Sequence, residues 1–474
     1  MVRPQVKASP AARVWGTLSG LVTSSPARFA LTVFIALIAL FTFLFSLPIA
    51  TATGEQASFT DALFSAVTVI CVTGLTTVDM ATYWSPFGHL LIFLGTQIGG
   101  VGVLTMASIL GLIVSRRLGL KQTLIAAGDV NPMRFSASGA RSEAQAVRLS
   151  DTKGLLRTVA ISMLVIEATV AVLLLPRMLL AGEPFLDSLW HAVFLAGMAF
   201  TNTGITPYSE GLAQFSHDPY FLIVLMVAVV LGAIGFPVIY SLTRTLFRPR
   251  AWSLHVRLTL VTFGILLVAG WLAILGLEWD NPATIGGEDF GQKLLQSAFV
   301  SVNARSGGLA TIDIGQMEES SLLVGDMLMF VGGGSASTAG GIKVTTFAVL
   351  LLAAIAEARG RDDMETFRRR IPIDVLRLAV AVTLWGATVV AATTVTLLIL
   401  TNFSLEDVIF DAISAFATVG LSTGFTENAP DAAQLVLAVT MFLGRVGTVT
   451  FAAALAARQH VQLFRRPEER PIVG

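Results

Sequence analysis

The chain has 474 residues, of which 54% are hydrophobic and 13% are charged. Soluble domains are about 25% charged, so the composition excludes an ordinary soluble domain and predicts an integral membrane protein in a lipid bilayer. The net charge of zero identifies no partner and no nucleic acid is expected, while the single cysteine, Cys71, excludes a disulfide framework and a multi-cysteine metal site.

The N-terminal segment, residues 1–28, is basic and is predicted to be a cytoplasmic tail. The apolar run Phe29–Leu47 that follows has 19 residues. This length is enough to cross the hydrocarbon core of a bilayer but is long for the apolar region of a signal peptide. We therefore interpret the run as a retained first helix, with a removed signal peptide as the alternative.

One order of segments then occurs four times: a span, an apolar run too short to cross a bilayer, a glycine-centred segment and a second span. The first spans are predicted at Phe29–Leu47, Thr158–Leu175, Leu258–Leu277 and Ile373–Leu400. The short runs are Phe59–Val72, Phe185–Phe200, Leu294–Val302 and Val408–Phe416. The second spans are Pro86–Val114, Tyr220–Leu242, the interrupted stretch Ser321–Ala356, and Gln434–Ala457. The predicted repeats are residues 29–115, 158–243, 258–357 and 373–457, before a cytoplasmic tail at 458–474.

Charge gives the orientation of these repeats. The stretches that hold the glycine segments contain 19 of the 31 acidic residues, but only Arg177, Lys293 and Arg305 of the 31 basic ones. By the positive-inside rule the linkers and termini are cytoplasmic and the glycine segments enter from outside. All four repeats then share one orientation, which indicates a parallel arrangement around an axis normal to the membrane.

The key glycines are Gly74, Gly204, Gly308 and Gly420. Non-helical backbone is tolerated inside a membrane only where it is buried in protein or lines water. Four such segments around one axis can line a pore with carbonyl oxygens that replace the hydration shell of a cation. The negative C-terminal ends of the short helices favour a cation at the same axis. The sequence therefore predicts an all-α membrane fold of four helix–pore-loop–helix repeats, pseudo-fourfold around a central pore as in potassium channels.

The predicted filter provides ion-binding groups from three residues in each repeat. These residues are Val72, Thr73, Gly74, Asn202, Thr203, Gly204, Ser306, Gly307, Gly308, Thr418, Val419 and Gly420. Glycine is suited to this task because successive inward carbonyls require φ values that a Cβ atom disfavours. The hydroxyl groups of Thr73, Thr203, Ser306 and Thr418 are expected near one level of the pore. In the alternative interpretation each glycine is only a turn residue between a short helix and a loop.

These segments resemble the filters of the Trk/Ktr/HKT superfamily of potassium transporters, and within it the Ktr-type (KtrB-like) membrane subunit. The matching motifs are at residues 72–77, 202–204, 305–309 and 417–423, and the resemblance covers about residues 28–458. In that superfamily glycine in all four filters goes with potassium permeation. Thr203 stands where alanine is common, and Gly307-Gly308-Leu309 where Ala-Gly-Phe is common, which leaves fine selectivity open.

The resemblance implies potassium uptake across the plasma membrane, with sodium dependence open. It also implies a homodimer on a cytosolic ring of nucleotide-binding regulatory subunits. This chain has no nucleotide-binding domain of its own, so a nucleotide would bind to the partner. The linker Ser115–Arg157 is a candidate docking segment for it.

The stretch Ser321–Ala356 is too long for a single span and is interrupted by glycine and hydroxyl residues. The predicted gating residues here are Gly332, Gly333, Gly334, Ser335, Ser337, Thr338, Gly340, Gly341 and Lys343. A phosphate-binding loop does not fit, because Ile342 separates Gly341 from Lys343, and a passive linker remains an alternative. The stretch is similar to the gating loop of Ktr-type subunits, which obstructs the pore below the filter.

Arg445 lies within the last predicted span, where a charge is costly and therefore a functional candidate. The alternative is a structural ion pair with Glu167 or Asp326. The resemblance to the Gly-Arg-x-Gly motif of Ktr-type subunits implies a gating cation near the pore. Three further polar residues, Asp61, His191 and Asp407, are predicted to be N-terminal caps of the short helices.

Two other functions were weighed against potassium uptake. A sodium- or ammonium-permeable channel of the same fold is the nearer alternative. A membrane-embedded enzyme is the remote one, because the five histidines are scattered along the chain. We therefore predict no catalytic residues and no enzyme, with K+ as the bound ion and Na+ as an open second ion.

Overall fold

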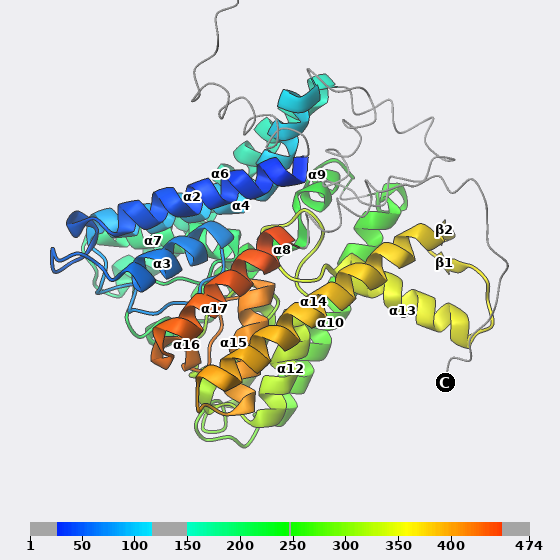
Figure 1. Ribbon diagram of the computed structural model, residues 1–474. Coiled ribbons are helices and arrows are strands. Elements are labelled where there is room, and N and C mark those ends of the chain that lie inside the picture. The colour runs from blue at the N-terminus through cyan, green and yellow to red at the C-terminus, as the bar shows by residue number, and fades with distance from the viewer. Residues whose placement is uncertain (1–25, 116–148, 246–247, 448–474) are drawn as a thin grey trace, which may run out of the picture.

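The computed structural model describes residues 26–115, 149–245 and 248–447 (Figure 1). Most of both predicted tails, most of the linker Ser115–Arg157 and the end of the last predicted span lie outside these residues. The described part is almost entirely helical, in the order that the sequence pattern predicts.

Repeat 1 contains α2 (Pro26–Phe45), α3 (Phe59–Cys71) and α4 (Pro86–Ser115). Repeat 2 contains α6 (Leu149–Leu180), α7 (Phe185–Thr201), α8 (Pro219–Ile234) and α9 (Phe236–Thr245). Repeat 3 contains α10 (Leu254–Leu277), α11 (Phe290–Asn303), α12 (Glu319–Phe330) and α13 (Val344–Ala358). Repeat 4 contains α14 (Ile373–Leu400), α15 (Leu405–Ala417), α16 (Phe425–Asn428), α17 (Asp431–Phe442) and a π-helical turn at Leu443–Gly447. Short 3-10 turns occur at Pro48–Ala50, Ala213–Phe215, Pro249–Ala251 and Ile314–Gln316.

Three described helices are long and apolar enough to cross a membrane: α6 from Val159, α10 and α14. Helices α8 and α9 together make a fourth candidate, but they meet at an angle of 104°. The span predicted over Tyr220–Leu242 therefore consists of two helices with a sharp bend between them. The bend lies at Gly235, whose φ of 91° suits glycine and whose missing Cβ leaves room for the Ser335 carbonyl.

Three of the four short helices, α3, α11 and α15, begin with polar side-chain caps, which differ from the predicted ones, and α7 begins after Pro184. Ser58 caps α3 by accepting a hydrogen bond from the Asp61 backbone N–H at 3.0 Å, and its hydroxyl donates to the Asp61 carboxylate at 2.7 Å. Ser404 and Asp407 form the same pair at α15. The predicted caps Asp61 and Asp407 thus lie three residues inside their helices, where a carboxylate still favours the positive helix end.

The third predicted cap, His191, is wrong, because it lies in the second turn of α7. Its Nδ1 atom is 2.9 Å from the Glu183 carboxylate in the loop before the helix. The hydroxyl of Tyr208 donates to the same carboxylate at 2.7 Å. His191 therefore joins the start of α7 to the outer loop that follows the second filter segment.

Contacts between helices arrange the repeats in a closed ring. In each repeat the helix that follows the filter packs on the short helix of the next repeat: α4 on α7, α8 on α11, α12 on α15, and α17 back on α3. A hydrogen bond from the Thr60 hydroxyl to Asp431 joins the first and last repeats at 3.2 Å. The N- and C-terminal repeats therefore lie side by side (Figure 1).

One element departs from the all-α prediction. Strands β1 (Met364–Thr366) and β2 (Arg369–Ile371) pair antiparallel just before α14. The two turn residues, Phe367 and Arg368, have φ values of 48° and 61°. Positive φ at both central residues is typical of a two-residue hairpin turn, although glycine or asparagine usually occupies it. Without that turn signature the sequence pattern gave no indication of a hairpin.

Candidate functional site

The four key glycines meet at the centre of the ring. A Cβ atom on Gly308 would lie 3.1 Å from the Cα of Gly204, and one on Gly420 would lie 3.1 Å from the Cα of Gly74. A Cβ on Gly74 would also come within 3.3 Å of the Gly420 Cα. Segments separated by more than 100 residues in sequence thus approach at their backbones, and only glycine allows this approach.

Carbonyl oxygens point into the same place. The Thr203 carbonyl oxygen would lie within 3.3 Å of a Cβ on Gly308 and 3.2 Å of one on Gly420, and nearer still to one on Gly74. The Thr73 carbonyl reaches Gly420, and the Val419 carbonyl reaches Gly308. Three of the four residues that directly precede a key glycine therefore direct their carbonyl oxygens at neighbouring repeats, as a ring of cation ligands requires.

The four filter segments, residues 72–74, 202–204, 306–308 and 418–420, share one backbone pattern. The first residue of each has positive φ: 57° at Val72, 59° at Asn202, 124° at Ser306 and 50° at Thr418. The last residue is the key glycine, with φ values between 71° and 97°. Left-handed backbone at non-glycine residues is uncommon and clusters at functional sites. A single glycine turn would not require the same strained residue two positions earlier in all four copies.

Side chains of the short helices hold this strained backbone. The Gly74 N–H donates to the Thr68 hydroxyl at 2.9 Å, and the Gly420 N–H donates to the Ser414 hydroxyl at 3.1 Å. In repeat 3 the Asn303 side-chain oxygen accepts from the Leu309 N–H at 3.2 Å. Thr68 and Ser414 lie six residues before their key glycines, and Asn303 lies five before Gly308, so nearby positions of three repeats perform one task.

The predicted hydroxyl groups do not form one layer. Thr73 and Thr203 directly precede their glycines, whereas Ser306 and Thr418 come two residues before theirs. The Thr203 hydroxyl pairs with that of Thr201 at 2.7 Å. The Ser306 hydroxyl donates to the Thr418 carbonyl at 3.4 Å, which links the third and fourth filter segments. The Ser306 hydroxyl thus braces the filter backbone, whereas those of Thr73 and Thr418 have no hydrogen-bond partner among the described residues.

Polar networks also fix the outer ends of the filter segments. Asp411 on α15 is fully buried and accepts hydrogen bonds from the Ser422 hydroxyl and the backbone N–H groups of Thr423 and Thr426, at 2.7, 3.1 and 3.0 Å. In repeat 1 the Thr77 hydroxyl donates to Asp61 at 2.8 Å. Each carboxylate ties the loop after a filter segment back to the short helix before it.

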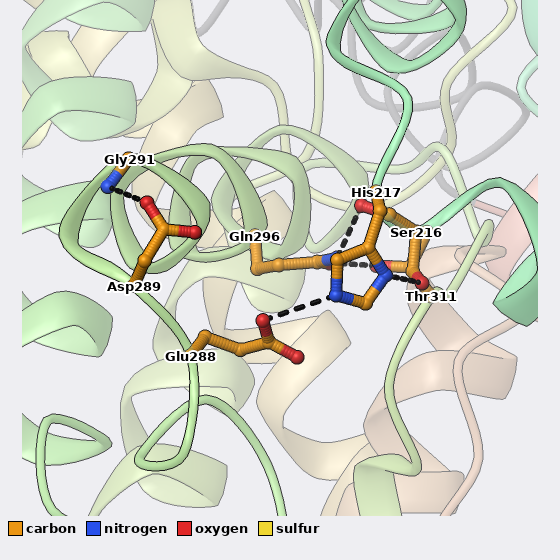
Figure 2. A network of polar contacts seen from close by, with 7 residues as sticks. All are labelled: Ser216, His217, Glu288, Asp289, Gly291, Gln296 and Thr311. Atoms are coloured by element: carbon orange, nitrogen blue, oxygen red, sulfur yellow. Dashed lines mark hydrogen bonds and ion pairs between the residues drawn. The ribbon is translucent and has the colours of Figure 1, made fainter.

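A third network joins repeats 2 and 3 (Figure 2). Gln296 on α11 is buried; its amide donates to the Ser216 carbonyl at 2.7 Å, and its oxygen accepts from the Thr311 hydroxyl. Nearby, the His217 ring lies 3.1 Å from the Glu288 carboxylate. Because Thr311 follows Gly308 by three residues, this network anchors the outer end of the third filter segment to the neighbouring repeat.

Three further glycines, Gly99, Gly232 and Gly444, explain how the segments after the filter fit so closely. A Cβ at Gly99 would collide with the Ile70 carbonyl, one at Gly232 with the Phe200 carbonyl, and one at Gly444 with the Phe416 carbonyl. Each carbonyl belongs to the residue four before a key glycine. Glycine at these three positions lets the surrounding helix contact the C-terminal end of the short helix.

The break predicted in repeat 3 is a loop, residues 331–343, that we call the central loop. Val331 and Ile342 pair as a parallel bridge that closes it at its base. Within it the Lys343 ammonium donates to the Ala339 carbonyl at 2.6 Å, and the hydroxyls of Ser335 and Thr345 lie 2.9 Å apart. The predicted gating residues Gly332, Gly333, Gly334, Ser335, Ser337, Thr338, Gly340, Gly341 and Lys343 thus lie in one compact, largely buried segment.

The central loop contacts the ends of the filter from several sides. A Cβ on Gly340 would lie 2.6 Å from the Ala417 carbonyl and would meet the Thr418 hydroxyl. The Thr338 hydroxyl donates to the Phe200 carbonyl at 3.2 Å. In the orientation that satisfies its hydrogen bonds, the Asn202 amide oxygen also accepts from Thr338, at 3.3 Å. The loop therefore lies directly against the second and fourth filter segments.

Arg445 is buried and joins the central loop to repeat 1. Its guanidinium donates to the Thr338 carbonyl and, at 3.3 Å, to the Gly99 carbonyl. In the described part of the chain Arg445 makes no ion pair with Glu167 or Asp326. The ion pair that was the alternative interpretation of this arginine is therefore not formed. The partners of this charge are backbone carbonyls of the loop and of α4.

A second buried arginine, Arg305, was not among the predicted site residues. Its Nη2 atom donates to the Gly332 carbonyl at 2.7 Å, and its guanidinium lies 4.7 Å from the ring centre of Phe263 on α10. One signal was available, because Arg305 is one of only three basic residues in the stretches that hold the glycine segments. It also directly precedes the third filter segment.

Comparisons with known proteins agree with this geometry. The sequence model of the TrkH family, described as "Cation transport protein", matches residues 29–462. The Ktr system potassium uptake protein D of Bacillus subtilis is 33% identical over 454 residues, which cover 95% of this chain and 97% of the relative. The potassium/sodium uptake protein NtpJ of Enterococcus hirae is 28% identical over 442 residues, 91% of this chain and 93% of the relative.

A solved structure has the same fold. The potassium transporter TrkH from Vibrio parahaemolyticus matches 91% of this chain and 85% of its own, with a TM-score of 0.68 and 16% identity. At this level of identity the likeness concerns the fold.

Proposed function

We propose, since the chain belongs to the TrkH family of cation transport proteins, that it carries potassium ions into the cell through the four filter segments. A family of transporters moves ions without a chemical reaction, so the chain is not an enzyme. One observation carries the proposal. Four glycine segments with strained backbones meet, and carbonyl oxygens of three of them point at neighbouring repeats. The potassium uptake function in the name of the Bacillus relative supports K+ as the ion.

The central loop is proposed to be the gate. It lies against the second and fourth filter segments, and Arg445 connects it to α4 of repeat 1. A loop in this position obstructs ions that have passed the filter, and it must move for them to leave. Movement of the loop would break the bond between Arg445 and the Thr338 carbonyl, because the same guanidinium is also bound to the Gly99 carbonyl of a neighbouring repeat.

The remaining proposals concern the cellular location, the partners and the sodium dependence of the protein. We place the protein in the plasma membrane as a multi-pass chain with cytoplasmic linkers and termini, and as a homodimer on a cytosolic ring of nucleotide-binding regulatory subunits. The Ktr system in the names of the relatives supports a partner subunit. Sodium dependence is proposed because one relative is named for both potassium and sodium.

Ion flux tests the proposal directly. Purified protein in liposomes, without any partner, is expected to conduct potassium and rubidium well and sodium poorly. Comparable rates for sodium or ammonium would favour the alternative, a channel of the same fold with broader permeability. Departures at Thr203 and at residues 307–309 from the usual filter motifs make this comparison necessary. No flux of any cation from folded protein would contradict both.

A further inference from the structure

Two buried arginines bind the central loop, and they hold different parts of it. Arg445 binds the carbonyl of Thr338 near the middle of the loop. Arg305 binds the carbonyl of Gly332 at its start, with 2.7 Å between Nη2 and the oxygen. Arg305 itself belongs to repeat 3, one residue before the filter segment 306–308. The Arg305 side chain thus connects the loop to the third filter segment.

The surroundings of Arg305 make this hydrogen bond important. The side chain is 0% exposed, and its Nε and Nη1 atoms have no hydrogen-bond partner in the described protein. Its other contact is the ring of Phe263, a cation–π interaction. A buried guanidinium with so few partners is costly. Loss of the Gly332 carbonyl would leave it without a protein hydrogen bond, so the side chain favours the position of the loop that supplies one.

The Gly332 carbonyl lies at the base of the loop, where the two ends of the loop meet. The Ile342 N–H donates to the Phe330 carbonyl at 3.3 Å, and the Val344 N–H donates to the Gly333 carbonyl at 3.0 Å, so both ends of the loop close together. A Cβ on Gly332 would collide with the Gly340 carbonyl, which shows how tightly the two ends pack. The bond to Arg305 is thus a feature of the closed loop.

The other end of the connection is the strained filter backbone. Ser306 follows Arg305 directly and has a φ of 124°, and its hydroxyl binds the Thr418 carbonyl. Gly308, two residues further, lies against Gly204 and the Val419 carbonyl. A shift of the Arg305 side chain would displace the filter backbone next to it, because this backbone is closely packed and close packing transmits strain.

We propose that Arg305 is a positioning residue that couples the central loop to the third filter segment, so that the position of the loop also sets ion selectivity. This inference rests on the proposed function of the loop as a gate. It goes further, because a gate that only blocks the pore would change the rate of flux and leave the preference for potassium over sodium unchanged.

The test uses the full chain in liposomes without a partner, and it measures both the potassium flux and the K+/Na+ permeability ratio from the reversal potential. Arg305→Gln removes the charge and is expected to raise flux and to lower the ratio about tenfold, the size of effect expected for one charge-assisted hydrogen bond. Arg305→Lys keeps the charge but loses the fork geometry. It is expected to recover only part of the ratio, which should stay about two- to threefold below that of the native protein.

Arg370→Gln is the matched control, because Arg370 is an exposed arginine that pairs with Asp363 on the hairpin. It is expected to change neither quantity. A change of flux in Arg305→Gln with an unchanged ratio would overturn the coupling, and so would native values of both.

If Arg305→Gln does not fold, Arg305→Lys decides alone: a ratio lowered about two- to threefold supports the coupling, and a native ratio overturns it. Absence of potassium flux in the native protein would instead contradict the proposed function.

Discussion

The guanidinium of Arg445 donates a hydrogen bond to the Thr338 carbonyl, 107 residues away in sequence. Through its second donor, to Gly99, the same side chain ties the central loop to the first repeat. We therefore interpret Arg445 as a residue that holds the loop in its closed position, and we call it the latch. We therefore expect the latch and the loop to affect flux in the same direction.

Replacing Arg445 by glutamine should raise potassium flux about tenfold, because the loop loses a charge-assisted hydrogen bond on which its closed position depends. Flux in liposomes measures this, and size-exclusion profiles in detergent monitor folding. A folded variant with unchanged flux would show that the arginine has a structural role only.

Shortening the central loop by removing residues 334–339 should also raise flux and weaken control by a cytosolic partner. The deletion removes Thr338 and with it the contacts to Arg445 and Phe200. The effect of Arg445→Gln should then disappear in the shortened protein, since the side chain has lost its partner. Two fully additive effects would argue against the latch.

Replacing Gly74 by alanine should remove most potassium flux, roughly a tenfold loss or more, because the new Cβ would occupy the space of the Thr203 carbonyl. Gly54→Ala is the control for backbone strain. Gly54 also has positive φ, 75°, but nothing lies within 4 Å of its Cβ position. Equal losses in the two variants would mean that strain, and not the close approach of the filter segments, explains the result.

Asp411→Asn should destabilise the protein by about 2–3 kcal/mol, because a buried acceptor of several hydrogen bonds loses its charge. It should also lower selectivity, since the loop after the fourth filter segment is no longer held. The half-buried Asp407 on the same helix provides the comparison, and Asp407→Asn should cost about 0.5 kcal/mol. Thermal unfolding in detergent and the reversal potential measure the two effects.

Much of the architecture was predictable because its causes are local. The short helix α15 was predicted at Val408–Phe416 and is found at Leu405–Ala417, since an apolar run of that length cannot cross a bilayer and must end in protein. The break before Val344 follows from glycines that weaken a helix. The bend at Gly235 was missed, because one glycine in an apolar run is compatible with a straight helix until the Ser335 carbonyl requires the space.

The sequence alone predicted the membrane class, the four units and the glycines of the proposed filter. Each of these depends on composition or on spacing within about 30 residues, which lipid and backbone geometry restrict strongly. Only the tertiary structure decided which groups the buried charges bind. Arg445 binds carbonyls of the central loop and α4 and makes no ion pair with Glu167, and Arg305 binds the start of the same loop. Backbone carbonyls are present at every residue and carry no sequence signal, so only the packing of distant repeats could select these partners.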